Sequence, residues 1–123
     1  MKIRELKTPE EIKNYLDSSE TNYVKVAITD IDGVLRGKYM HIDKFIKSSE
    51  SGFGFCDVIF GWDSNDELYN FKNVGEEDLF TGWHSGFPDV KTKIIPESGR
   101  QNPFEKNIPL FLAELSHAQV CPR

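Results

Sequence analysis

The chain has 123 residues, of which 15 are basic and 20 acidic, so its formal net charge at pH 7 is −5. This length suits one domain with a substantial core, and we expect residues 1–123 to form a single domain because two would be cramped. The acidic balance disfavours nucleic acid or an anionic membrane surface as a partner. No apolar run approaches the roughly 20 residues that span a bilayer, and no signal segment opens the chain.

The cysteines and histidines favour a cytoplasmic protein without a bound metal. Cys56 and Cys121 lie far apart and lack CxxC spacing, which is typical of a reduced protein without a metal cluster. The three histidines are isolated from one another in the sequence, so a zinc site is not expected.

Thr8-Pro9-Glu10-Glu11 is a strong helix start. Thr8 can cap the first turn, Pro9 suits the first helical position, and Glu11 completes a capping box. Ile12, Tyr15 and Leu16 then fall on one face. The pattern predicts a short helix that ends at residues 17–19 and packs by one apolar stripe.

The stretch from Tyr23 to Ile42 predicts a β-hairpin. Val24, Val26 and Ile28 alternate with more polar residues, which is the period of a strand with one buried face. Asp32-Gly33 supplies a turn, in which Asp30 can bond nearby backbone N–H groups, and a second strand follows. We expect Arg36 and Lys38, on this second strand, to form a solvated or interface face.

A different interpretation of the same stretch is a phosphatase. Asp30-Ile31-Asp32-Gly33 after an apolar strand resembles the first motif of haloacid-dehalogenase-like phosphatases. The resemblance implies that Asp30 is the nucleophile and Asp32 a general acid, both beside Mg²⁺. Lys25 and Thr29 interrupt the strand, whereas a fully buried parallel strand is continuously apolar. A downstream acidic pair of the expected kind is also missing from the sequence.

The remaining elements are predicted from shorter patterns. Asp43 can cap a second short helix, and residues 55–60 can form a strand between glycines. Residues 63–88 form a long polar loop, which in a compact domain is usually functional or disordered. Residues 90–95 predict a strand, and residues 108–115, the most continuously apolar run, predict a central strand that begins near Pro109. The order of elements indicates an α+β fold, a β-grasp-like mixed sheet with short helices and one long loop.

The aromatic residues of the middle third are open to two interpretations. They lie in glycine-rich stretches rather than in periodic ones, and they include Phe53, Phe55, Phe60, Trp62, Phe80, Trp83 and Phe87. They either form a surface that a partner or a second domain covers, or fill the core beneath long loops. His84, beside Trp83, is either a ligand-binding residue or an exposed loop histidine.

Several short motifs in this order and spacing resemble the N-terminal β-grasp domain of the glutamine synthetase family. They are Thr29 to Gly33, Arg36 to Lys38, Gly54-Phe55 through Trp62, Pro88-Asp89, and Asn102 to Glu105 before an apolar strand. The resemblance runs over residues 20–123, and residues 121–123 resemble the junction to that family's large catalytic domain. It implies that the chain is an N-terminal part of a longer ligase and is catalytically silent alone.

The resemblance also implies a mechanism for the longer ligase. ATP phosphorylates the side-chain carboxylate of glutamate, and ammonia or an amine displaces the phosphate. ATP and Mg²⁺ or Mn²⁺ are bound by the catalytic domain, and no cofactor is expected in residues 1–123 themselves. The expected partners are the catalytic domains of the chain's own subunit and of a neighbouring subunit in a homo-oligomeric ring. A free-standing β-grasp interaction module without catalysis is the alternative.

In the family, a loop of this domain reaches the neighbouring active site with a Phe-Asp-Gly-Ser-Ser motif and a following Trp. The resemblance therefore implies that Asp57 binds and deprotonates the nitrogen substrate and that Trp62 lines its site. Their alternatives are an exposed carboxylate at a strand end and a ring packed under the loop. Val58-Ile59-Phe60 replaces the small polar residues of the motif. This replacement predicts a larger amine substrate or a divergent branch such as the γ-glutamyl-amine ligases.

Overall fold

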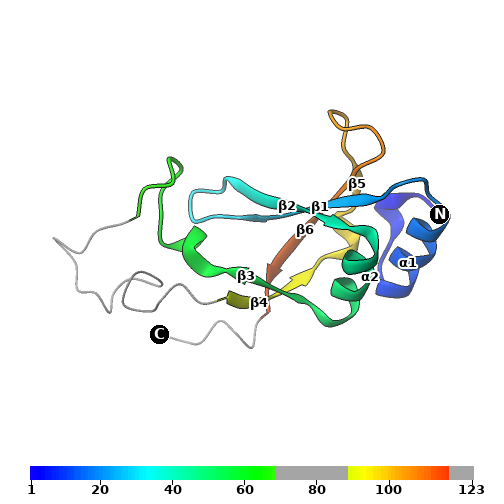
Figure 1. The fold of residues 1–123 in the computed structure, drawn as a ribbon, viewed down its shortest axis with the longest axis horizontal. Helices are drawn as coiled ribbons and strands as arrows, with labels where there is room; N and C mark the ends of the chain where they lie inside the picture. The colour runs from blue at the N-terminus through cyan, green and yellow to red at the C-terminus, as the bar shows by residue number, and fades with distance from the viewer. Residues whose placement is uncertain (69–88, 117–123) are drawn as a thin grey trace.

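The computed structural model describes residues 1–68 and 89–116, and the description below concerns these residues. Two helices, α1 (Pro9–Asp17) and α2 (Ile42–Ser51), lie together at one end of a mixed sheet (Figure 1). The predicted α+β fold is confirmed. Short 3-10 turns precede α1, follow the third strand and precede the fifth, at η1 (Ile3–Glu5), η2 (Asp57–Phe60) and η4 (Pro96–Ser98).

The strand order of the sheet is β2-β1-β6-β4-β3, with the short β5 paired to β6. The strands are β1 (Tyr23–Thr29), β2 (Leu35–His41), β3 (Phe53–Cys56), β4 (Asp89–Ile94), β5 (Arg100–Gln101) and β6 (Pro109–Leu115). The predicted hairpin is β1–β2, with Val26 opposite Lys38 and Ile28 opposite Arg36. β1 also pairs in parallel with β6, which is the central strand that its apolar sequence predicted.

The core lies between the two helices and one face of the sheet. Ile12, Leu16 and Phe45 come from the helices, and Val24, Val26, Met40, Ile94 and Phe111 come from the strands. The rings of Phe45 and Phe111, both fully buried, have their centres 5.0 Å apart. The alternation of Val24, Val26 and Ile28 therefore directs the apolar side of β1 toward the helices.

Local sequence signals placed the helices, with two corrections. Thr8 Oγ1 accepts from the Glu11 N–H at 3.2 Å, as predicted, but the Glu11 carboxylate accepts from the N–H of Lys7 at 2.7 Å and so closes the box one residue early. α2 begins at Ile42, and its cap is His41, whose Nδ1 accepts from the Asp43 N–H at 3.2 Å. The prediction that Asp43 is the cap was wrong, because the imidazole nitrogen is an acceptor as well.

The predicted strand over residues 55–60 is also shorter than expected. β3 ends at Cys56, and Asp57 begins the turn η2. The apolar run Val58-Ile59-Phe60 lies within this turn and is not part of a strand, and Ile59 is buried. An apolar run of this length does not separate a strand from a buried turn.

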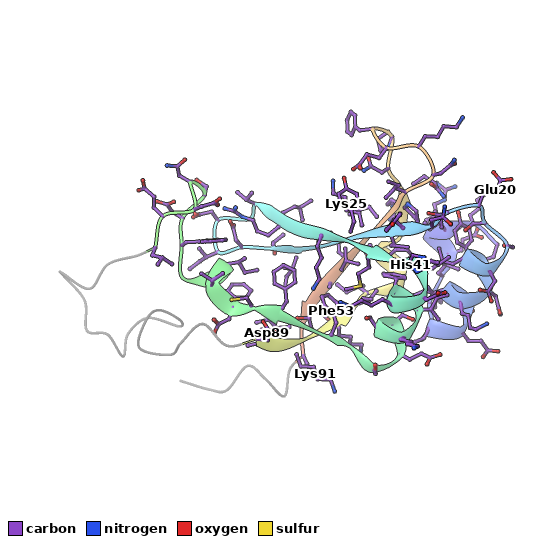
Figure 2. All side chains as sticks on the ribbon, in the orientation of Figure 1. Glu20, Lys25, His41, Phe53, Asp89 and Lys91 are labelled. Carbon is purple, nitrogen blue, oxygen red and sulfur yellow. The ribbon has the colours of Figure 1, made fainter. Side chains whose placement is uncertain are left out.

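The sheet curls so that its two edge strands approach each other. The Lys38 ammonium of β2 lies 5.1 Å from the ring centre of Phe53 and 5.5 Å from that of Phe55, both on β3. Phe53, labelled in Figure 2, occupies the space between β3 and the hairpin. Phe53, Phe55 and Trp62 are half-buried, and Phe53 packs against the core, which favours the core-filling interpretation for Phe53. Phe80, Trp83, His84, Phe87 and Cys121 lie outside the described residues.

Candidate functional site

The turn between β1 and β2 is built around the carboxylate of Asp30. Its Oδ1 accepts from the N–H groups of Asp32 and Val34, both at 2.9 Å, and Gly33 takes the left-handed conformation that the turn requires, with φ 81°. Its Oδ2 accepts from Nε of Arg36 at 3.0 Å. Burial by itself raises the pKa of Asp30, but the N–H of Val34, the Arg36 guanidinium and the N–H of Asp32 together hold it below its ordinary value.

This geometry confirms Asp30 as a turn-forming residue and opposes the phosphatase interpretation. Both oxygens of Asp30 are occupied by backbone N–H groups and by a guanidinium, and its side chain is fully buried. Asp32 is exposed. A nucleophilic carboxylate must reach a phosphorus atom, and Asp30 is turned away from solvent into its own turn.

Arg36 connects this turn to the segment that follows η2. Its Nη1 contacts the Asp66 carboxylate and its Nη2 donates to the Asp63 carbonyl at 3.3 Å. Its Cζ lies 5.2 Å from the centre of the Trp62 ring. Asp66 and Asp30 both raise the pKa of Arg36 above its ordinary value. Only 18% of the Arg36 side chain is exposed, so Arg36 does not form a solvated face, and the alternative of an interface face stays a prediction.

The segment of residues 61–68 forms a compact turn of its own. Asp63 Oδ1 accepts from the N–H groups of Asn65 at 2.8 Å and Glu67 at 3.1 Å, and the Asp63 N–H donates to the Glu67 carbonyl at 2.9 Å. Asp66 has φ 63°, and Trp62 bridges to Leu68. The first part of the predicted long loop is therefore ordered by an aspartate that organises backbone N–H groups.

The two predicted site residues belong to this region. Asp57 is the first residue of η2 and is only 4% exposed, so the alternative of an exposed strand-end carboxylate is wrong. Trp62 is half-buried beneath Arg36, and its Nε1–H is buried without a hydrogen-bond partner among the described residues. They lie on one continuous segment that begins at the end of β3.

Lys38 is a second cation on the same side of β2 as Arg36. Arg36 and Lys38 are on the same side of the strand, and each faces aromatic rings: Arg36 faces Trp62, and Lys38 faces Phe53 and Phe55. Burial and the charge of Lys44 lower the pKa of Lys38, although Asp89 opposes this effect. Lys38 is only partly exposed and faces these rings, so it does not form a solvated face either, and the alternative of an interface face stays a prediction. The contact of Lys38 with these rings is not apparent in the sequence, because it forms only when the curl of the sheet brings β2 and β3 together.

A second polar cluster lies on the opposite face of the hairpin. Glu105 accepts from Lys25 Nζ at 2.9 Å, from Asn102 Nδ2 at 2.9 Å and from the hydroxyl of Tyr39. Lys25, labelled in Figure 2, points away from Phe53 toward the connection between β5 and β6. The hydrogen bonds from Tyr39 and Lys25 hold the pKa of Glu105 below its ordinary value.

Residues 1–68 and 89–116 contain neither a candidate metal site nor a candidate membrane-spanning helix. No three His, Cys, Asp or Glu side chains gather there in a way that could hold a metal ion. In the same ranges, no helix is long and apolar enough to cross a bilayer.

The comparisons with known proteins agree with the resemblance in the motifs. Over about 90% of its length, the chain is similar to members of the glutamine synthetase family. It is 43% identical over 117 residues to the type-1 glutamine synthetase 2 of Dictyostelium discoideum, an alignment that covers 91% of this chain. It is 29% identical over 109 residues, 86% of its length, to a glutamate–isopropylamine ligase from a Pseudomonas species. No protein-family model matches the chain.

The chain spans about a fifth of the length of these relatives, 21% of the first and 22% of the second. Among solved structures, it is similar to GmaS in an ADP complex and to GmaS without ligand, with a TM-score of 0.55 in both cases. The matches cover 85% and 84% of this chain and 20% of each GmaS chain, at 16% identity. At that identity, the likeness to GmaS supports the fold alone.

Proposed function

We propose that this chain is the N-terminal β-grasp domain of a longer glutamine synthetase-type ligase, which joins ammonia or an amine to glutamate with ATP. The observation that carries the proposal is the 43% identity over 117 residues to a type-1 glutamine synthetase. In this proposal, ATP and Mg²⁺ or Mn²⁺ bind in the catalytic part of the longer ligase, where they supply the activated phosphate. The protein acts in the cytoplasm as part of a homo-oligomeric ring.

The role of the domain in this proposal is to complete the active site of a neighbouring subunit. Asp57 binds the nitrogen substrate and takes a proton as the amine becomes nucleophilic, and Trp62 lines the site. A carboxylate suits both tasks, because it attracts an ammonium ion strongly where water is excluded. Since Asp57 is only 4% exposed, direct contact with an amine requires η2 to shift when the site assembles.

The nitrogen substrate in this proposal is an amine larger than ammonia. Val58, Ile59 and Phe60 provide apolar groups in place of hydrogen-bond partners for ammonium, and Val58 and Phe60 are only half-buried. One relative is named for its reaction with isopropylamine, which carries a branched alkyl group. An apolar wall favours such a group over ammonium, whose N–H donors it leaves unpaired.

The proposal is tested on the complete gene product. Reading the gene beyond the codon for Arg123 should reveal a continuing frame, and the expressed protein should form γ-glutamyl amides from glutamate, ATP and an amine. We expect isopropylamine or another alkylamine to be preferred over ammonia. A clear preference for ammonia would contradict the substrate assignment, and a frame that stops at Arg123 would favour the free-standing interaction module.

The roles of the site residues require their own variants. Asp57→Asn should lower kcat/KM for the amine about a hundredfold, as expected for loss of a proton acceptor, whereas Asp43→Asn on the exposed start of α2 should not. Mixing Asp57→Asn subunits with subunits inactivated in the catalytic domain should restore activity if the site is shared between subunits. Mixed rings that stay inactive would show that each subunit completes its own site.

A further inference from the structure

Arg36 joins two segments of the chain that are not paired in the sheet. Its Nε lies 3.0 Å from Asp30 in the turn after β1, and its Nη1 and Nη2 reach Asp66 and the Asp63 carbonyl in the segment after η2. Arg36 and Asp66 are 30 residues apart in the sequence. A β-hairpin needs no contact with Asp63 or Asp66, so Arg36 makes contacts beyond those of the hairpin itself.

The Trp62 ring lies against the guanidinium of this arginine. A buried indole is usually oriented by a hydrogen bond from its N–H, but the Nε1–H of Trp62 has no partner within residues 1–68 and 89–116. The guanidinium of Arg36 instead lies over the ring, 5.2 Å from its centre. The same guanidinium is fixed from three other directions by Asp30, Asp66 and the Asp63 carbonyl.

We propose that Arg36 is a positioning residue, which holds the Trp62 ring and the segment after η2 in one orientation against the β1–β2 turn. Its consequence for the nitrogen substrate rests on the function proposed above, in which Trp62 lines the substrate site. A planar guanidinium can stack on a ring while its N–H groups bind two carboxylates and a carbonyl. The ammonium group of lysine is a compact point charge on a flexible stem, so a lysine at position 36 cannot make all of these contacts at once.

The positioning is tested in the 123-residue chain by NMR. The chain contains two tryptophans, and the indole N–H resonance that disappears in Trp62→Phe identifies Trp62. Arg36→Lys and Arg36→Gln should both shift this resonance, with the amide resonances of β1 retained as evidence of folding. Lys38→Gln is the matched control, because Lys38 lies on the same side of β2 but contacts Phe53 and Phe55. Its Trp62 resonance should remain in place.

A third variant covers the case in which the Arg36 substitutions do not fold. Asp66→Asn removes one partner of Arg36 at a side chain that is 58% exposed, so it leaves no buried charge unpaired. It should move the Trp62 resonance in the same direction by a smaller amount. A Trp62 resonance that stays in place in every folded variant of Arg36 and Asp66 would overturn the proposal.

The consequence for the substrate is tested in the complete ligase. Arg36→Lys should raise KM for the amine about tenfold, equivalent to about 1.4 kcal/mol, while KM for ATP remains unchanged. If the Trp62 resonance shifts but KM for the amine does not change, Arg36 has no positioning role toward the substrate. A complete gene product without any ligase activity would refute the proposed function, and the NMR result would still decide whether Arg36 orients Trp62.

Discussion

Two glycines on opposite edges of the sheet allow a direct test of how closely β1 and β2 approach. Gly37 of β2 pairs with Ala27 of β1. A Cβ added at Gly37 would lie 2.6 Å from the carbonyl oxygen of Val26 and 3.2 Å from the Cβ of Ala27. A Cβ added at Gly54 of β3 would meet the side chain of Asp89 first, with Oδ2 at 3.1 Å. The first obstacle is backbone in the hairpin, whereas the second is an exposed side chain that can rotate away.

The two substitutions to alanine should therefore have opposite effects on stability. Where the backbone conformation is compatible, Gly→Ala stabilises a protein by about 0.4–1 kcal/mol, because alanine restricts the unfolded chain. Forcing an extra methyl into filled space costs about 1–3 kcal/mol. We expect Gly37→Ala to lower the free energy of unfolding by about 1–2 kcal/mol, since the strands must separate locally. Gly54→Ala should raise it by about 0.5 kcal/mol.

Urea unfolding followed by far-UV circular dichroism measures both differences, and equal m-values would show that the change is in stability. Gly37 lies between Arg36 and Lys38, so the local separation should also shift the Trp62 indole resonance. The reasoning would be refuted if Gly37→Ala were as stable as the parent chain. It would also be refuted if the two substitutions destabilised the protein equally, because the nature of the obstacle would then not matter.

Two further predictions concern carboxylates. Asp30→Asn should lower the melting temperature far more than Asp32→Asn in the same turn, because Asp30 binds Arg36 in a buried position and Asp32 is exposed. Equal effects of the two substitutions would contradict the role of Asp30 in forming the turn. In the folded state the pKa values of Asp30 and Glu105 are lowered. Their stabilising contribution is therefore complete above their unfolded-state pKa values, about 3.9 for Asp and 4.3 for Glu. It is lost as the pH falls through the folded-state pKa values. Urea unfolding at a series of pH values should therefore show stability falling below about pH 5, less steeply in Asp30→Asn, and a rise on acidification would contradict it.

Much of the local structure followed from short-range signals in the sequence. Thr8-Pro9 starts α1, the alternation from Val24 to Ile28 forms β1, and Asp30 with Gly33 forms the turn. These features depend on residues within about four positions of one another, and such interactions are similar in many proteins. The errors at α2 and at residues 55–60 arose where one sequence allows two local structures, since histidine can cap a helix and an apolar run can form a turn.

The sequence by itself determined the resemblance to the glutamine synthetase family, the α+β class and the hairpin with its Asp30 turn, because each rests on residue types and their spacing. Only the tertiary structure decided that Arg36 and Lys38 face aromatic rings, that Asp57 is buried, and that Trp62 lies under a guanidinium. The physical reason is the curl of the sheet, which brings β2 against the segment from β3 to residue 68. A charged residue on a strand faces water or an aromatic ring according to what the rest of the chain places opposite it.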